Sequence, residues 1–221
     1  MCCIVVSAQN PHAELWGTYS IRKYIPERQF RIRNDIGARR AFTTSPNTTF
    51  LYRPRAIFSI GNYLELTAAA DFRYTNYQDT SNVFEIRTWE GAQLHWPQIG
   101  RVMFDHVYKF EQRFYLIHGY NKDNISLRSR YRFRMRIPIN KRAITERTYY
   151  TDLQFEGFFS HDNNVDELFA NTVRLGIVAG YNHSVKWRYA LQFYVDRGRN
   201  EVDNNITNDR AIVSLLVRNT F

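Results

Sequence analysis

One stretch of this chain places an arginine at every second position. Between Leu127 and Ile137 the arginines are Arg128, Arg130, Arg132, Arg134 and Arg136, and the residues between them are Ser129, Tyr131, Phe133 and Met135. An α-helix would scatter these guanidinium groups around its circumference, whereas a β-strand places all five on one face. The stretch is therefore predicted to be a strand with one charged face and one mainly apolar face.

The same period of two recurs along most of the chain. Apolar and aromatic residues alternate with polar ones in the ranges 50–60, 64–75, 149–159, 173–182, 187–196 and 211–221. The predicted fold class is all-β, an antiparallel transmembrane β-barrel of about 10–12 strands. The segments number eleven, but single-chain bacterial barrels normally have an even number of strands. We therefore expect ten or twelve strands, with one strand missed or with the segment 15–24 outside the wall.

Two settings fit this alternation. In a soluble barrel the apolar face lines the interior, whereas in a membrane barrel it faces lipid and the charged face lines the lumen. The mean hydropathy of −0.50 excludes a bundle of membrane helices but not a barrel, because alternating strands have a low average hydropathy. Aromatic residues near the predicted strand ends favour the bacterial outer membrane; they are Trp16, Tyr24, Tyr63, Trp96, Tyr181 and Trp187.

The connections between the segments are predicted to alternate in length. Tight turns are expected near residues 26–29, 61–62, 98–100, 140–142 and 182–184, and longer polar loops near 39–47, 76–82, 117–124, 161–167 and 199–207. Short periplasmic turns and longer outer loops are typical of outer-membrane barrels. The repeat of about 40 residues also resembles a propeller blade, but the strands are too long for the four strands of one blade.

The N-terminus and the body of the chain differ. Residues 1–9 form a short apolar run that ends in small residues, which predicts the remnant of a secretory signal peptide; a short apolar strand is the alternative. Cys2 and Cys3 are adjacent and cannot cross-link the fold, and a lipid anchor there is less favoured. Residues 10–221 are predicted to form one barrel domain. No zinc-ligand spacing is present, so neither a metal nor a cofactor is expected.

Several segments resemble a known family. They are the run from Arg87-Thr88-Trp89 to Phe114, the arginine ladder with the Ile137-Pro138-Ile139-Asn140 that follows it, the early Leu15-Trp16 and the terminal aromatic residue. Together they resemble the domain-of-unknown-function 2490 family, outer-membrane proteins typical of Bacteroidetes. The resemblance extends over nearly the whole chain and implies the location and the fold but no activity. The terminal Phe221 also resembles the signal by which the assembly machinery recognises outer-membrane barrels.

Inside such a barrel the five arginines of the ladder need anions. Carboxylates on the neighbouring strands can supply them, with further cations interleaved: Asp105, Lys109, Glu111, Arg113, Asp152 and Glu156. A salt-bridge network that fills the lumen is the favoured interpretation. An anion-selective lining is the alternative, with a small anion as the solute. The formal net charge of +9 does not indicate a nucleic-acid partner, because the charged face of an exported barrel is enclosed.

Polar residues on the predicted lipid face suggest a second site. If Gly100 closes the turn after Trp96, Glu90 and His106 become diagonal neighbours across two strands, and Ser129 lies on the next strand. A serine activated by a histidine is the machinery of a membrane-embedded lipid hydrolase or acyltransferase. The other histidines are expected at the surface; they are His12, His95, His118, His161 and His183. The favoured function is a non-enzymatic barrel, either a small pore or a structural or binding element surrounded by lipid.

Overall fold

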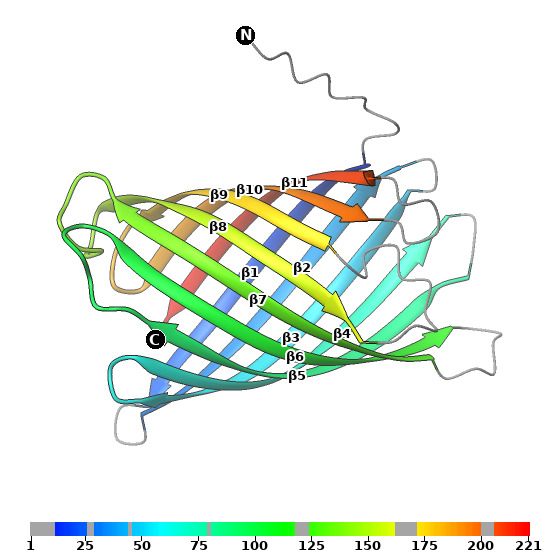
Figure 1. Cartoon of the computed structure of the whole chain (residues 1–221), viewed down its shortest axis with the longest axis horizontal. Coiled ribbons are helices and arrows are strands. Elements are labelled where there is room, and N and C mark those ends of the chain that lie inside the picture. The colour runs from blue at the N-terminus through cyan, green and yellow to red at the C-terminus, as the bar shows by residue number, and fades with distance from the viewer. Residues whose placement is uncertain are drawn as a thin grey trace, which may run out of the picture.

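The computed structural model describes residues 12–25, 29–43, 46–78, 81–117, 124–161, 172–199 and 206–221. These residues form eleven strands that close into one barrel (Figure 1). The strands are β1 (His12–Ile25), β2 (Phe30–Phe42), β3 (Asn47–Ile60), β4 (Leu64–Tyr77), β5 (Val83–His95), β6 (Met103–Ile117), β7 (Asn124–Pro138), β8 (Thr148–Ser160), β9 (Thr172–Asn182), β10 (Trp187–Arg199) and β11 (Ile206–Thr220). The predicted signal-peptide remnant, with Cys2 and Cys3, lies outside the described residues.

The barrel closes through a parallel pair of strands. Every strand pairs antiparallel with its neighbour in sequence, but β1 pairs parallel with β11, from His12 beside Arg210 to Arg22 beside Thr220. The expectation of an even number of strands was wrong, and the segment 15–24 lies in the wall. The reason is geometric: hairpins reverse the chain at each step, so the first and last of eleven strands run in the same direction.

The two faces of the wall differ sharply in polarity. Aliphatic and aromatic side chains point outward on every strand, among them Phe50, Leu66, Leu175 and Ile177, and many are 40% exposed or more. Charged side chains point inward and are buried, including Asp35, Asp71, Glu111, Asp152 and Asp196. The barrel therefore has an apolar outer surface and a charged interior. Among the described residues, no helix is long and apolar enough to cross a bilayer.

Trp16 is an exception to the expected belt of aromatic residues at the strand ends. It points inward, is only 9% exposed, and its indole N–H donates a hydrogen bond to Glu14 Oε2 at 2.6 Å. Its assignment to the outer interface was wrong. Tryptophan needs a partner for its N–H when it is buried, and Glu14, two residues earlier on the same face, provides one. Trp96 does lie on the outside, and Tyr24 and Tyr63 are exposed near strand ends, although Tyr24 falls on the inward face of β1 with Trp16 and Ser20.

The two rims of the barrel are defined by the connections. We call the rim where β11 ends the C-terminal end; β1, β3, β5, β7 and β9 also end there, and it carries the turns 61–63, 96–102, 139–147 and 183–186. At the opposite end β1 begins and β2, β4, β6, β8 and β10 end (Figure 1). The strands extend further than predicted, so β2 and β3 are joined by residues 43–46 alone. The link 139–147 at the C-terminal end is longer than this, so the contrast in length between the rims is smaller than expected.

Candidate functional site

A cavity of 860 Å³ occupies the barrel interior. Eighteen arginines and Lys109 line it, whereas the carboxylates in its lining are Asp35, Glu65, Asp152, Glu156 and Asp196. Its walls include Tyr77 and Tyr115 near the opposite end and Arg31 and Arg188 near the C-terminal end. The cavity therefore extends along most of the length of the wall, and positive side chains dominate its lining.

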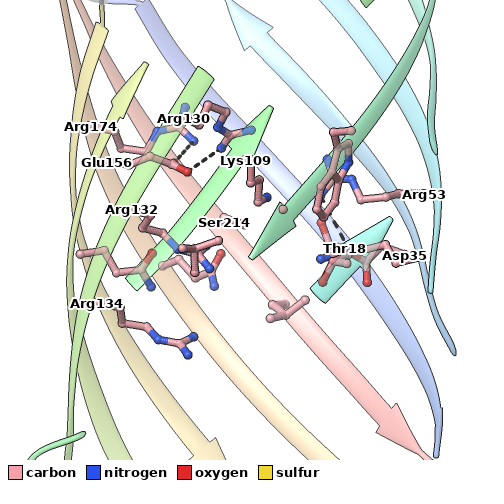
Figure 2. A pocket seen from close by; sticks show the side chains of 18 of the residues that line it. Thr18, Asp35, Arg53, Lys109, Arg130, Arg132, Arg134, Glu156, Arg174 and Ser214 are labelled. Atoms are coloured by element: carbon pink, nitrogen blue, oxygen red, sulfur yellow. Dashed lines mark hydrogen bonds and ion pairs between the residues drawn. The ribbon is translucent and has the colours of Figure 1, made fainter. Parts of the chain in front are cut away.

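The arginine ladder lies on the interior face of β7, and four of its five members contact carboxylates. Glu111 on β6 accepts hydrogen bonds from Arg128 at 2.6 Å and from Arg130 at 2.7 Å. Arg130 also donates to Glu156 of β8 at 2.7 Å, as Figure 2 shows. The remaining two pairs are Arg134 with Asp105, at 2.8 Å through Nε, and Arg136 with Asp152, at 2.6 Å.

The rest of the wall carries a similar network of ion pairs, which was not predicted from the sequence. Its carboxylates each contact two or more cations: Asp35 contacts Arg33 and Arg55, Asp71 contacts Arg53 and Arg73, Glu85 contacts Arg87 and Arg113, and Asp196 contacts Arg174 and Arg210. The alternation that revealed the ladder was also present in these strands. Cross-strand partners, however, depend on the register, which the sequence does not specify.

Aromatic rings support several of the interior cations. The guanidinium of Arg39 lies 3.9 Å from the ring centroid of Trp16, and the ammonium of Lys109 lies 4.2 Å from that of Trp89. Arg130 lies 4.6 Å from the ring of Phe158. Such cation–π contacts stabilise a positive group without neutralising it. Arg39 and Lys109, which have no carboxylate partner among the described residues, therefore keep their charge available to the cavity.

Some interior cations have no carboxylate partner among the described residues; they are Arg22, Arg39, Lys109, Arg132, Arg188 and Arg218. Arg132 and Lys109 project into the cavity from β7 and β6 (Figure 2). The Nε atom of Arg132 is buried without a hydrogen-bond partner in the protein. A buried, unpaired charge is unfavourable, so these groups favour an anion in the cavity.

The outward site does not have the predicted arrangement. Gly100 has the expected positive φ of 60°, but Glu90 pairs with Phe110, and His106 pairs with Leu94. Glu90 and His106 are therefore not diagonal neighbours, and that prediction was wrong. An isolated bridge between Ile99 and Val102 closes the turn, and Trp96 then pairs with Phe104 rather than with Val102, which shifts the register of the hairpin by two residues.

His106 and Ser129 have other partners instead. His106 Nδ1 lies 2.6 Å from the hydroxyl of Tyr131. The Oγ of Ser129 lies 2.7 Å from Nε2 of His161, the residue that directly follows β8. The Tyr108 hydroxyl lies 3.2 Å from the same Oγ. Sequence reasoning missed the serine–histidine pair because His161 was assigned to a surface loop.

His95 also differs from expectation. It is the last residue of β5 and was expected at the surface, but it lines the cavity. One ring nitrogen contacts Asp105, and the other lies 3.2 Å from Glu65. His118 lies outside the described residues. Within the described part of the chain, no group of three or more His, Cys, Asp or Glu residues is arranged to hold a metal ion.

Comparison with known proteins places this barrel in a family. The family model described as "Protein of unknown function (DUF2490)" matches residues 13–207. The chain belongs to the DUF2490 family. The match spans every strand up to the start of β11, so the resemblance of the early Leu15-Trp16, the Phe104–Phe114 run and the ladder is a family relationship. No curated protein and no solved structure matches the chain.

Proposed function

We propose that this DUF2490 protein is a bacterial outer-membrane barrel whose interior forms a narrow passage that prefers small anions. The observation that carries the proposal is the cavity lining, in which arginines greatly outnumber carboxylates. Charged rings and linings of one sign select ions of the opposite sign. The family carries no assigned activity, so the proposal rests on the geometry of the interior.

The outer surface supports the membrane setting. Large apolar side chains are exposed on the outer face of the strands. Phe50, Leu175 and Ile177, for example, are each at least half exposed. Soluble monomers rarely expose apolar patches larger than a few hundred Å², whereas a membrane barrel needs an apolar band. The exposed terminal Phe221 fits the role of a recognition signal for the barrel-assembly machinery.

The size of the barrel supports a narrow passage. Barrels of about eight strands are filled by side chains, and those of 16–18 strands hold an open channel. Eleven strands lie between these limits, and here the arginine side chains occupy part of the interior. The same enclosure keeps the charged face away from nucleic acid.

Conductance in planar bilayers tests this function. The purified chain is expected to give single-channel steps, with a reversal potential in a KCl gradient that shifts toward the chloride equilibrium potential. Arg132→Gln removes an unpaired cation from the cavity lining and is expected to reduce the anion preference. Arg40→Gln is the matched control, because Arg40 contacts Thr48 near the rim and does not line the cavity. A folded barrel without steps, or a cation preference, would contradict the proposal.

A second candidate function is favoured by the contact between Ser129 and His161. The pair lies on the outer wall, where the ring centroid of Phe110 is 6.1 Å from that of His161. Next to it an apolar groove of 560 Å³ is lined by Phe58, Leu66, Ala68, Glu90, Tyr108 and Phe110, among others. In a lipid hydrolase, Ser129 Oγ would attack an ester carbonyl while His161 takes its proton and passes it to the departing alcohol, which leaves an acyl-serine ester. Water would then attack this ester, with His161 again accepting and returning the proton, so that the fatty acid is released and the Ser129 hydroxyl is restored. The groove would hold the acyl chain.

Lipid hydrolysis in micelles distinguishes this candidate from the passage. If the chain is a hydrolase, Ser129→Ala abolishes release of fatty acid from phospholipid, and His161→Ala lowers the rate by about 10²–10⁴-fold, the usual contribution of a general base. His106→Ala is the control and leaves the rate unchanged, since His106 contacts Tyr131 and not Ser129. No hydrolysis by the folded wild-type barrel, or full activity in Ser129→Ala, removes this candidate.

A further inference from the structure

Four interior arginines lie on adjacent strands where the barrel closes. Arg33 lies on β2, Arg22 on β1, Arg218 on β11 and Arg188 on β10, and these four strands are adjacent in the wall. All four side chains line the cavity near the C-terminal end. We call this group the seam cluster.

The register sets like charges directly opposite each other within the seam cluster. Arg22 pairs with Arg33, and Arg188 pairs with Arg218. Arg218 lies beside Ser20 on β1, which places it diagonally to Arg22 and within reach of so long a side chain. Like charges directly opposite each other destabilise a sheet, so this arrangement needs a compensating group.

The protein supplies little compensation here. Among the described residues only Arg33 contacts a carboxylate, Asp35, at 2.9 Å, and Asp35 also contacts Arg55. Arg188 donates to the amide oxygen of Asn182 at 3.2 Å. The Nε atoms of Arg22 and Arg218 are buried and have no hydrogen-bond partner in the protein. Arg33 Nε also donates to Ser20 Oγ at 2.9 Å, so the donors without a protein acceptor are the Nε atoms of Arg22 and Arg218, on the two strands that close the barrel.

We propose that the seam cluster is a binding site for a tetrahedral oxyanion such as inorganic phosphate. This inference deepens the proposed anion passage by naming the ligand class and its site. Guanidinium groups present paired N–H donors that match the oxygens of phosphate, whereas chloride offers a single centre without such geometry. A bound oxyanion would accept hydrogen bonds from β1 and β11 together and would stabilise the closure of the barrel.

The site predicts an unusual response of stability. Without phosphate, Arg218→Gln is expected to raise the thermal midpoint of the barrel, since it removes one like charge and keeps a polar side chain. Phosphate is expected to raise the midpoint of the wild type and to raise that of the variant much less. A variant that is destabilised without phosphate, or that gains as much from phosphate as the wild type, contradicts the proposal.

Calorimetric titration of the detergent-solubilised full chain with inorganic phosphate, at constant ionic strength in chloride, measures the site directly. Saturable binding is expected, and Arg22→Gln and Arg218→Gln are each expected to weaken it about tenfold, the effect of one charge-assisted hydrogen bond. Arg39→Gln is the matched control, because Arg39 is an unpaired arginine in the same cavity near the opposite end. It should leave the affinity unchanged.

The outcomes separate the site from the passage. Sulfate is expected to compete with phosphate, whereas chloride is not; equal competition by chloride would overturn the inference. Absence of saturable binding, or an equal loss in Arg39→Gln and Arg218→Gln, would also overturn it. The titration needs no membrane, so it is independent of the conductance measurement. If the barrel binds phosphate but does not conduct, the seam site stands and the anion passage is contradicted. If the barrel conducts but does not bind phosphate, the passage stands and the seam site is contradicted.

Discussion

Glu111→Gln is expected to lower the free energy of unfolding by about 3–5 kcal/mol, the usual cost of breaking a buried ion pair. Glu111 is only 1% exposed and accepts hydrogen bonds from Arg87, Arg128 and Arg130. Glutamine keeps the shape but removes the charge, so three buried guanidinium groups lose their common counter-ion. Equilibrium unfolding in urea, followed by tryptophan fluorescence of the barrel in phospholipid vesicles, measures the loss.

Glu90→Gln is the matched control for this change. It makes the same chemical substitution on the outer wall, where Glu90 is exposed and pairs with Phe110 across the hairpin. In the proposed membrane setting its free energy of unfolding is expected to stay the same or to rise, because a charge on a surface that faces lipid is unfavourable. Equal losses in the two variants would show that Glu111 is not a centre of the interior network.

Ile177→Arg is expected to destabilise the barrel by about 2–4 kcal/mol in a bilayer, the cost of an arginine at the midplane. Ile177 is the middle residue of β9 (Thr172–Asn182) and is 50% exposed on the outer wall. In a soluble protein the same substitution would put a charge into water at almost no cost. The free energy of unfolding in vesicles therefore tests the membrane setting directly.

Val185→Arg is the control for depth. Val185 is 79% exposed in the turn between β9 and β10, beyond the end of the apolar band. In the membrane setting its substitution is expected to change the free energy of unfolding by about 0–1 kcal/mol, as at an interface. If both variants change stability by the same small amount, the outer wall does not face lipid.

The arginine ladder shows which features of the interior could be predicted from the sequence. A period of two places Arg128 through Arg136 on one face whatever the neighbouring strands are. Four carboxylates were predicted within reach on the two adjacent strands, and in the structure each contacts the ladder: Glu111, Asp105, Asp152 and Glu156. These contacts could be predicted because strands that follow each other in the sequence are neighbours in a barrel. The order of β6, β7 and β8 in the sequence therefore gives their pairing.

The outward site shows where this reasoning fails. The distance between Glu90 and His106 depends on how the turn around Gly100 closes, and its closure through the bridge between Ile99 and Val102 sets a register two residues from the predicted one. His161 reaches Ser129 because β8 pairs with β7 up to Ser160 opposite Arg128. Sequence periodicity fixes the face on which a side chain lies, but the residue opposite it depends on turn geometry that a few residues decide.

By itself, the sequence determined that this protein is a single all-β barrel with alternating faces, since alternation is a local property that each strand carries. Only the tertiary structure decided that the wall has eleven strands, that β1 and β11 close it in parallel, and that Arg22 and Arg218 therefore lie on neighbouring strands, two positions apart in the register. The strands at the two ends of a chain share no local sequence pattern from which their contact could be predicted. The physical reason is that their pairing follows from closure of the whole sheet, which no segment of the sequence contains.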